Sequence, residues 1–200
     1  MYLYGAGGHA KSVRDVLTSR HIAIEGIYDD NPAVAEFMGL PVQHSLAGIG
    51  EVIICIGDNH RRRLIAERLC RQGITFGRGI HAQAIVSPYA EIGEGTVVMP
   101  GAIVNSGARI GRHCIINSGA VVEHDCRVGD FVHIASHATL GGGVTAHEGC
   151  LVSAGATVTL GLHIGAWSTV GAGAVVVRDV PDGVIAYGIP CRVIRESNHH

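Results

Sequence analysis

A histidine between two carboxylates is the first feature of the sequence that could do chemistry. It lies in the stretch Val122-Glu123-His124-Asp125-Cys126. A histidine has a pKa near neutrality, and a neighbouring carboxylate can orient its ring, which is what a general base needs. His124 is therefore a candidate base with Asp125 as its partner. The alternative interpretation is a solvated histidine on an acidic turn.

Three further histidines, His113, His133 and His137, stand close to it in the sequence and are expected to be exposed. His133 could face the same groove as His124, either in one subunit or from a neighbouring one, and His137 is a weaker candidate. Asn117 is either a turn residue or an amide contact to a substrate. A site of three histidines for a metal would need an ordered spacing with supporting carboxylates, which these residues do not show, so we expect no metal.

A second group near the beginning of the chain could bind a ligand. Gly5-Ala6-Gly7-Gly8-His9-Ala10 fits the pattern G-x-G-x-x-G/A, and the acidic pair Asp29-Asp30 follows about 20 residues later. Glycine lets the backbone approach a ligand closely, and the start of the following helix offers free N–H groups. The carboxylates could bond a sugar hydroxyl or a base. The alternative is a glycine turn that only packs.

The elements that must position this turn are short. Apolar stretches predict strands at residues 1–4, 22–28 and 52–56, and helical spacing follows the glycine turn and again covers 60–72. In the second helix Leu64, Ile65, Arg68 and Leu69 are expected along one side. The order indicates a small parallel sheet, a shortened Rossmann-like unit.

Residues 80–181 repeat in units of six. Counted from Ile80, the first place of 17 successive hexads is Ile, Leu or Val in 16 cases, and the fifth place is mostly small. A hexapeptide repeat is typical of a parallel β-helix, in which three hexads close one triangular coil. We therefore predict between five and six stacked coils with the aliphatic residues inside. The second place, often Gly, is expected to take the turn conformations.

Composition limits the remaining possibilities. The 200 residues are 47% hydrophobic and 16% charged with a net charge of −2, which indicates a globular chain without a nucleic-acid surface. There is no apolar run long enough to span a membrane, and the chain opens directly into MYLYGAGGHAK, so we expect no signal peptide and a cytoplasmic protein. The six cysteines form no CxxC pair and read as small buried residues in a reducing compartment.

Six stretches resemble one known family along almost the whole chain. They are GAGGHAK after Tyr4, YDD at 28–30, IGDN at 56–59, IHAQAIVSP at 80–88, IINSGAVVEHDC at 115–126 and YGIPCR at 187–192. The family comprises sialic acid O-acetyltransferases and nucleotide-sugar N-acetyltransferases of the NeuD/PglD type. The resemblance implies a small N-terminal Rossmann-like α/β domain, residues 1–79, and a left-handed parallel β-helix of hexapeptide repeats, residues 80–181. A cap and tail, 182–200, would follow, with the polar end frayed.

The resemblance also implies roles for particular residues. His124 matches the catalytic base of the family and Asp125 the acidic residue that raises its basicity, although the family often has Glu at that place. Positions matching the nucleotide-sugar site are Gly7, Gly8, His9, Asp29, Asp30 and Gly57, and Asn117 matches a residue near the acceptor amine. Positions matching contacts to acetyl-CoA are His133 near the thioester, and Ala154, Gly171, Ala172 and Gly173 along the pantetheine arm. Cys191 stands where the closing motif usually has Ala.

The expected function is that of an acetyl-CoA-dependent enzyme. By resemblance, a homotrimer would transfer acetyl from acetyl-CoA to the amine of a UDP- or GDP-linked amino sugar in polysaccharide biosynthesis, without a covalent acyl-enzyme. Two alternatives are an O-acetyltransferase acting on sialic acid or a related sugar, and a non-enzymatic nucleotide-sugar-binding module. The sequence leaves open the sugar, the nucleotide and the glycan pathway. It also leaves open whether His199 and His200 are native or belong to a tag.

Overall fold

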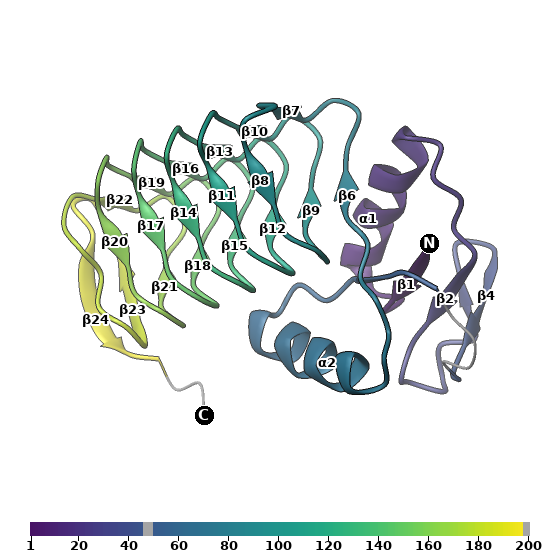
Figure 1. Cartoon of the computed structure of the whole chain (residues 1–200). Helices are drawn as coiled ribbons and strands as arrows, with labels where there is room; N and C mark the ends of the chain where they lie inside the picture. The colour runs from purple at the N-terminus through teal and green to yellow at the C-terminus, as the bar shows by residue number, and fades with distance from the viewer. Residues whose placement is uncertain (46–49, 198–200) are drawn as a thin grey trace.

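The chain folds into a small α/β domain that packs on one end of a long stack of triangular coils (Figure 1). The structure, a computed structural model, describes residues 1–45 and 50–197. The tail predicted to be frayed covers residues 196–200. Glu196 ends a strand and Ser197 N donates to Gly183 O at 2.6 Å, so fraying is not seen at these two residues. Residues 198–200, which include His199 and His200, lie outside the described residues. The N-terminus lies in the α/β domain, and residues 192–196 lie at the far end of the stack (Figure 1).

The N-terminal domain is the expected parallel sheet with an added hairpin. Its elements are β1 Tyr2–Tyr4, α1 Gly8–Ser19, β2 Gly26–Tyr28, β3 Glu36–Phe37, β4 Leu40–Gln43, β5 Val52–Ile54 and α2 Asn59–Arg71. The strand order is β3-β4-β2-β1-β5, parallel except for the antiparallel pair β3 and β4. That hairpin was not predicted, because its tight turn places Met38 at φ 50° beside Gly39 at φ 82°. Methionine is not a typical residue for such a turn.

Helix α1 packs this domain against the stack of triangular coils formed by residues 79–176, here called the prism. Its buried side chains Ala10, Val13, Val16 and Leu17 recur at helical spacing. They share one apolar cluster with Val97, Met99 and Ile115, which belong to the first coils of the prism. The two parts therefore have a continuous core where they meet.

The prism is built from very short strands, one in each hexad. They are β6 Gly79–Ile80, β7 Ile85–Val86, β8 Glu91–Ile92, β9 Val97–Val98, β10 Ile103–Val104, β11 Arg109–Ile110, β12 Ile115–Ile116, β13 Val121–Val122, β14 Arg127–Val128, β15 His133–Ile134, β16 Thr139–Leu140, β17 Thr145–Ala146, β18 Leu151–Val152, β19 Thr157–Val158, β20 His163–Ile164, β21 Thr169–Val170 and β22 Val175–Val176. Each strand from β6 to β19 pairs in parallel with the strand three hexads further along the chain, as Ile116 pairs with Ile134. Three strands thus make one coil, as the hexad pattern predicted.

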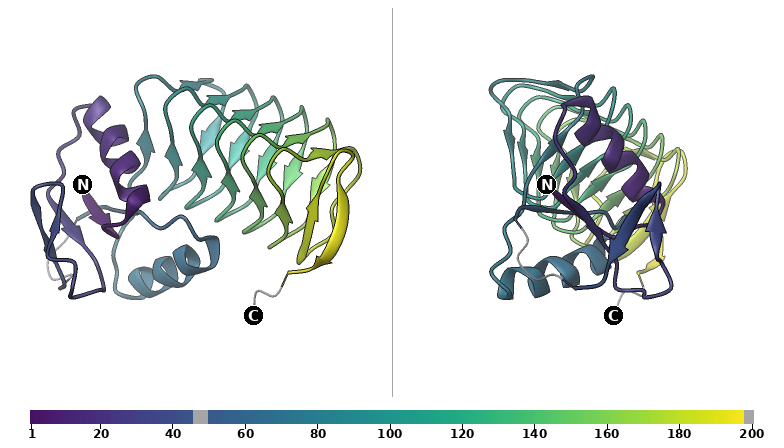
Figure 2. Two further views of the ribbon diagram at one scale, coloured as in Figure 1. Left: turned by 180° about the vertical axis from the view of Figure 1, so that it is seen from behind. Right: turned by 90° about the vertical axis from the view of Figure 1, so that its right-hand side faces the viewer.

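These strands form three faces of six, five and eight strands. The six-stranded face runs from β7 to β22, the five-stranded face from β8 to β20, and the eight-stranded face from β6 to β21 with two more strands at its end. Those two are β23 Val184–Tyr187, parallel to β21, and β24 Arg192–Glu196, antiparallel to β23. Figure 2 shows the stack from behind and from its end.

The interior follows the predicted pattern of aliphatic and small residues. First-place residues such as Ile116, Val122 and Ile134 are fully buried, as are small fifth-place residues such as Ala120 and Cys126. Branched aliphatic side chains fill the coil, and small ones leave room where the wall bends. Apolar area removed from water stabilises such a stack by about 25 cal/mol per Å².

The second-place glycines do not adopt the turn conformations that the sequence predicted. Positive φ occurs at the fourth place of every hexad from residue 95 to residue 173, and at none of the second-place glycines. A Cβ on second-place Gly93 or Gly129 would instead come within 2.5 or 2.8 Å of the backbone of the next coil. The second place therefore needs glycine because successive coils touch there, and the fourth place carries the left-handed turn.

Neither helix in the described residues has the length and apolar character that a membrane span requires.

Candidate active site

Three predicted glycines leave an open edge on the N-terminal sheet. Gly7 is the N-cap of α1, Gly8 begins that helix, and Gly57 follows β5. A Cβ added at any of them would meet nothing within 4 Å. Gly5 differs, with φ 100° and a Cβ position only 2.8 Å from the Ile56 side chain. The fold itself therefore needs Gly5, whereas the other three leave space for the close approach of a ligand.

The two predicted aspartates lie at this edge but have different partners. The carboxylate of Asp29 accepts hydrogen bonds from Ala6 N at 2.8 Å and Asn31 N at 2.9 Å, so it holds the glycine turn in place. Asp30 pairs with Arg68 at 3.0 Å, and Arg68 also bonds the hydroxyl of Tyr4. A cavity of about 240 Å³ opens beside these side chains.

His133, Asn117 and His9 meet where the sheet edge faces the eight-stranded face. Asn117 Oδ1 accepts from Ser118 N at 2.8 Å, which turns its amide nitrogen toward Nε2 of His133 at 3.0 Å. Nε2 of His133 therefore accepts, and a hydrogen bond with the Gly57 backbone also reaches this ring. Asn117, predicted near the acceptor amine, and His133, predicted near the acetyl-CoA thioester, therefore contact each other, and Gly57 of the N-terminal domain reaches the same ring.

Both imidazoles at this junction are neutral at pH 7. Burial lowers the pKa of His133 to about 3, and the charges of Arg62 and of His9 act in the same direction. Burial, with Arg62, lowers the pKa of His9 to about 4. Nε2 of His9 is buried and has no hydrogen-bond partner within residues 1–45 and 50–197.

The proposed catalytic pair lies elsewhere, on the turn that follows β13. Nδ1 of His124 is 2.9 Å from Oδ2 of Asp125, and both side chains are well exposed, at 65% and 73%. The hydrogen bond to Asp125 raises the pKa of His124. Glu123 contributes less directly, because its carboxylate accepts from Asn105 Nδ2 at 2.8 Å. Asp125 sits at φ 60°, a fourth-place turn position.

One prism does not bring this pair to the other site residues. His124 is at the corner between the six-stranded and five-stranded faces, since it links β13 and β14, whereas His133 lies on β15 of the eight-stranded face. In a three-sided prism a corner is opposite the third face. The expectation that His124 and His133 share a groove therefore does not hold within one subunit.

The positions predicted to contact the pantetheine arm of acetyl-CoA lie on a third part of the surface. Ala154 and Ala172 stack at the corner between the eight-stranded and six-stranded faces, where Gly173 N donates to Ala154 O at 2.9 Å. Asn117 lies at the same corner, two coils earlier. Packing explains two of the glycines, because a Cβ on Gly171 would come within 2.6 Å of Tyr187 and Gly173 has φ 65°.

One sequence expectation was wrong in this region, and another is confirmed only in part. His113 is not an exposed candidate: it is 4% exposed and its ring lies between Phe76 and Phe131. Helix α2 buries the expected side only in part, since Leu69 is fully buried but Leu64 is 58% exposed. The buried residues are Asn59, Arg62, Ala66 and Leu69, which also recur at helical spacing.

Arg62 is the residue that the sequence reasoning missed. It stands in a run of three arginines that reads as a solvated surface, and only its spacing from Ala66 and Leu69 could have marked it as buried. Among the described residues, no group of three or more His, Cys, Asp or Glu side chains is arranged to hold a metal ion.

Comparison with known proteins identifies both domains. Residues 1–69 match the PglD N-terminal domain, and residues 89–124 and 107–142 match the bacterial transferase hexapeptide family of six repeats. Curated relatives align over shorter segments. The match to UDP-N-acetylbacillosamine N-acetyltransferase of Bacillus subtilis is 44% identical over 48% of this chain and 50% of that protein. The match to galactoside O-acetyltransferase of Escherichia coli is 40% identical and covers 28% of this chain and 27% of that protein. The chain therefore spans about a quarter to a half of the length of these two relatives.

Solved structures align over nearly the whole chain. A histidine-to-asparagine variant of perosamine N-acetyltransferase from Caulobacter crescentus, in complex with CoA and GDP-perosamine, is 38% identical with a TM-score of 0.93 and covers 98% of this chain and 96% of that one. The acetyltransferase domain of PglB from Neisseria gonorrhoeae is 33% identical with a TM-score of 0.90 and covers 96% and 98%. With both domains in the same order and these identities along the full length, the chain belongs to the NeuD/PglD-type family of hexapeptide-repeat acyltransferases.

Proposed function

We propose that the protein transfers an acetyl group from acetyl-CoA to the amine of a nucleotide-linked amino sugar. The observation that carries this proposal is the exposed, hydrogen-bonded pair of His124 and Asp125, at 2.9 Å, on a chain that shares 38% identity with a sugar N-acetyltransferase in complex with CoA and GDP-perosamine. The co-substrate is acetyl-CoA. No metal ion is invoked, because a positioned base and backbone N–H groups can supply the chemistry.

The proposed step is direct attack without an acyl-enzyme. The amine nitrogen bonds to the thioester carbonyl carbon, the C–S bond breaks, and CoA leaves as its thiolate. Neutral His124 accepts the proton of the amine through Nε2, while Asp125 accepts a hydrogen bond from Nδ1 and stabilises the imidazolium that forms. The proton then passes to the CoA thiolate. A positioned base of this kind contributes about 10²–10⁴-fold to the rate.

We infer that the working form is a homotrimer whose sites lie between prisms. One subunit would supply His124 and its neighbour would supply Asn117, His133 and the open glycine edge, which a single prism keeps apart. The six-stranded face supports such a contact. Its outward-pointing residues include Ile85, which is 64% exposed, and the partly exposed Ile103, Val121 and Val175. A stable monomer at micromolar concentration in light scattering would contradict this assembly.

The acceptor site is proposed at the edge formed by Gly7, Gly8 and Gly57, with His9, Asp29 and Asp30 beside it. A nucleotide diphosphate would approach the N-terminus of α1, where free N–H groups favour anions. Asn117 would face the acceptor amine and His133 the acetyl-CoA thioester. Ala154, Gly171, Ala172 and Gly173 would line the pantetheine arm. The cavity beside Asp30 would bind the nucleotide and distinguish UDP from GDP.

The six cysteines are free, which is typical of a reducing compartment. Not all are buried as the sequence predicted, because Cys70 is exposed and Cys191 is half-buried. We therefore place the reaction in the cytoplasm, in the biosynthesis of a polysaccharide or another glycan.

The test is an acceptor panel. The protein is mixed with acetyl-CoA and a set of UDP- and GDP-linked amino sugars, sialic acid and other hydroxy sugars, and the released CoA thiol is measured. Thiol release with a nucleotide-linked amino sugar supports the proposal. Release only with sialic acid would make the protein an O-acetyltransferase. If no acceptor gives thiol release but the nucleotide sugar still binds, the protein would be a non-enzymatic nucleotide-sugar-binding module.

A further inference from the structure

Arg62 is the most deeply buried charged side chain in the described part of the protein, at 1% exposure. Its guanidinium holds the loop before α2 through Nη1, which donates to Ile56 O at 2.9 Å and Gly57 O at 3.1 Å. Its other nitrogens reach the prism, where Nε donates to His113 O at 2.8 Å and Nη2 to Phe131 O at 2.8 Å. One side chain thus ties the glycine edge to two coils.

Asn59 extends the same arrangement by one coil. Its Oδ1 accepts from Nη2 of Arg62 at 2.7 Å, and its Nδ2 donates to Gly149 O at 3.0 Å. Asn59 Nδ2 also donates to Cys150 O at 3.1 Å. The other carbonyls that Arg62 and Asn59 bind on the prism, those of residues 113, 131 and 149, follow one another at intervals of three hexads and all belong to fourth-place turns. The first turn of α2 is therefore fitted to a regular row of carbonyl groups.

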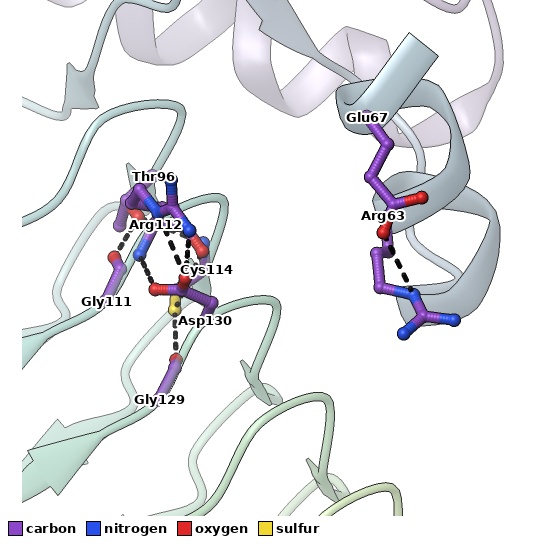
Figure 3. Close-up of polar contacts among 8 residues, drawn as sticks. All are labelled: Arg63, Glu67, Thr96, Gly111, Arg112, Cys114, Gly129 and Asp130. Atoms are coloured by element: carbon purple, nitrogen blue, oxygen red, sulfur yellow. Dashed lines mark hydrogen bonds and ion pairs between the residues drawn. The ribbon is translucent and has the colours of Figure 1, made fainter. Parts of the chain in front are cut away.

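None of these hydrogen-bond partners of Arg62 is a carboxylate. On the exposed side of the same corner, Arg112 bonds Asp130 of the next coil at 2.8 and 2.9 Å, and Arg63 pairs with Glu67 on the facing helix (Figure 3). A buried charge that is not paired with a carboxylate is costly, and domain packing alone could be achieved with apolar residues. The charge therefore points to a role beyond joining the domains.

The contacts among Gly57, His133 and Asn117 indicate this role of Arg62. Gly57, which Arg62 holds, hydrogen-bonds His133. Burial is the main cause of the low pKa of His133, and the charge of Arg62 lowers that pKa further. An imidazolium at this place could no longer accept the hydrogen bond of Asn117, because both ring nitrogens would be donors. Keeping His133 neutral therefore keeps the amide of Asn117 in its orientation.

We propose that Arg62 is a positioning residue of the acceptor site, which fixes Gly57 against the prism and thereby the His133 ring that holds the amide of Asn117. The proposal rests on the proposed function for the identity of the ligand, a nucleotide-linked sugar. The ionisable groups around His133 are His9 from α1, and Asp58, His60 and Arg62 from α2 and its N-cap. Of these, only Arg62 combines burial with hydrogen bonds to both domains.

The test uses the full-length protein and three variants. Arg62→Met removes the charge and the hydrogen bonds, Arg62→Lys keeps the charge and loses most of the hydrogen bonds, and Arg61→Met is the control on the exposed neighbouring position. We expect Arg62→Met to raise the KM for the nucleotide sugar at least about tenfold, as for the loss of buried hydrogen bonds. The KM for acetyl-CoA should stay within about twofold. Arg61→Met should match the wild type in both.

A measurement without substrate separates this proposal from the proposed function. NMR of the histidine rings should show that the pKa of His133 rises in Arg62→Met and stays low in Arg62→Lys. Fluorescence of Trp167, the single tryptophan, which stacks on His60 of α2, reports whether the domains remain docked. If wild type acetylates no sugar, the proposed function fails, and the His133 titration still decides the role of Arg62.

Two results would overturn the inference. One is a folded, docked Arg62→Met protein in which His133 titrates as in the wild type. The other is an equal rise in KM for both substrates, which would assign Arg62 to general stability. If Arg62→Met does not fold, Arg62→Lys decides alone: it should raise the KM for the sugar while the pKa of His133 stays low, and an unchanged KM would contradict the proposal.

Discussion

The ring of His124 lies over Gly142 of the next coil, where a Cβ would come within 2.7 Å of Nε2. Gly142 has no positive φ, so alanine fits its backbone and the only obstacle is the imidazole. We predict that Gly142→Ala turns His124 away from its working position and lowers kcat about tenfold, with little change in thermal stability. In a His124→Ala background the same change should cost nothing further, because coupled residues are not additive. Additive losses would show that Gly142 acts on something else.

His124 itself carries the proposed mechanism. Its side chain is 65% exposed, so His124→Ala removes no core volume and should leave the melting temperature nearly unchanged. Steady-state kinetics should show kcat reduced by about 10²-fold or more, while acetyl-CoA still binds. A folded, trimeric and fully active variant would remove His124 from the reaction.

Asp125 should act through the pKa of His124. Because the hydrogen bond to Asp125 raises that pKa, the base becomes neutral, and hence active, only at higher pH. In Asp125→Ala the pKa falls, so the acidic limb of the kcat–pH profile moves to lower pH while the maximal rate drops less than in His124→Ala. A limb that stays in place or moves upward would show that Asp125 does not set the basicity of His124.

The open glycine edge gives a separate prediction for the acceptor. A Cβ atom at Gly8 would meet nothing from the rest of the fold within 4 Å, so Gly8→Val should fold normally and obstruct a ligand. The KM for the nucleotide sugar should rise, and the KM for acetyl-CoA should serve as the internal control and stay nearly constant. Equal changes in both constants would mean that the turn supports the fold rather than the ligand.

His113 provides a prediction for stability and pH. Burial, followed by the charges of Arg62 and Arg112, lowers its pKa to about 4, and its Nδ1 is buried without a partner among the described residues. As pH falls below about 6.5 the unfolded chain binds a proton that the folded ring refuses, so stability is lost between pH 6.5 and 4, by about 2 kcal/mol at pH 5. Above pH 6.5 this contribution is absent.

Replacing His113 with Phe should remove this loss. Phe131 already occupies the equivalent turn at φ 60°, so the new ring can stack in the same way. Urea unfolding should show His113→Phe to be more stable by about 1 kcal/mol at pH 7, because an unpaired buried nitrogen is gone. At pH 5 the gain should be larger. The exposed His147→Gln serves as control, and an equal pH dependence in His113→Phe and wild type would refute the assignment.

The prism was predictable because its rule is local and repeated. Each inward aliphatic residue, such as Ile116 or Val122, makes the same contact as its counterpart three hexads away, so the pattern is visible in the sequence alone. The positive φ at the fourth place was not predictable from glycine content. His113, Asp125, Phe131, His137 and Trp167 adopt it too, where neighbouring coils hold the turn. Tertiary packing there overrides the preference of each residue.

The candidate site was predictable only in part. The glycine turn, Asp29 and the exposed pair of His124 and Asp125 could be named from their types and order, and the structure places them at exposed edges and corners. What the sequence could not reveal is which of them share one surface, because this depends on how successive hexads divide among three faces. The burial of Arg62 was also hidden, since its partners are main-chain carbonyls, which any sequence provides.

The regular pairing of strands three hexads apart makes length along this prism discrete. Removing three successive hexads beyond the domain junction, for example 155–172, should excise one whole coil, shorten the stack by about 4.8 Å and return every later side chain to the same face. Removing a single hexad would instead rotate all later residues by one face and separate the cap from its sheet. A protein of this kind can therefore change its length only in whole coils. The distance between the two ends of the prism changes in steps of one coil.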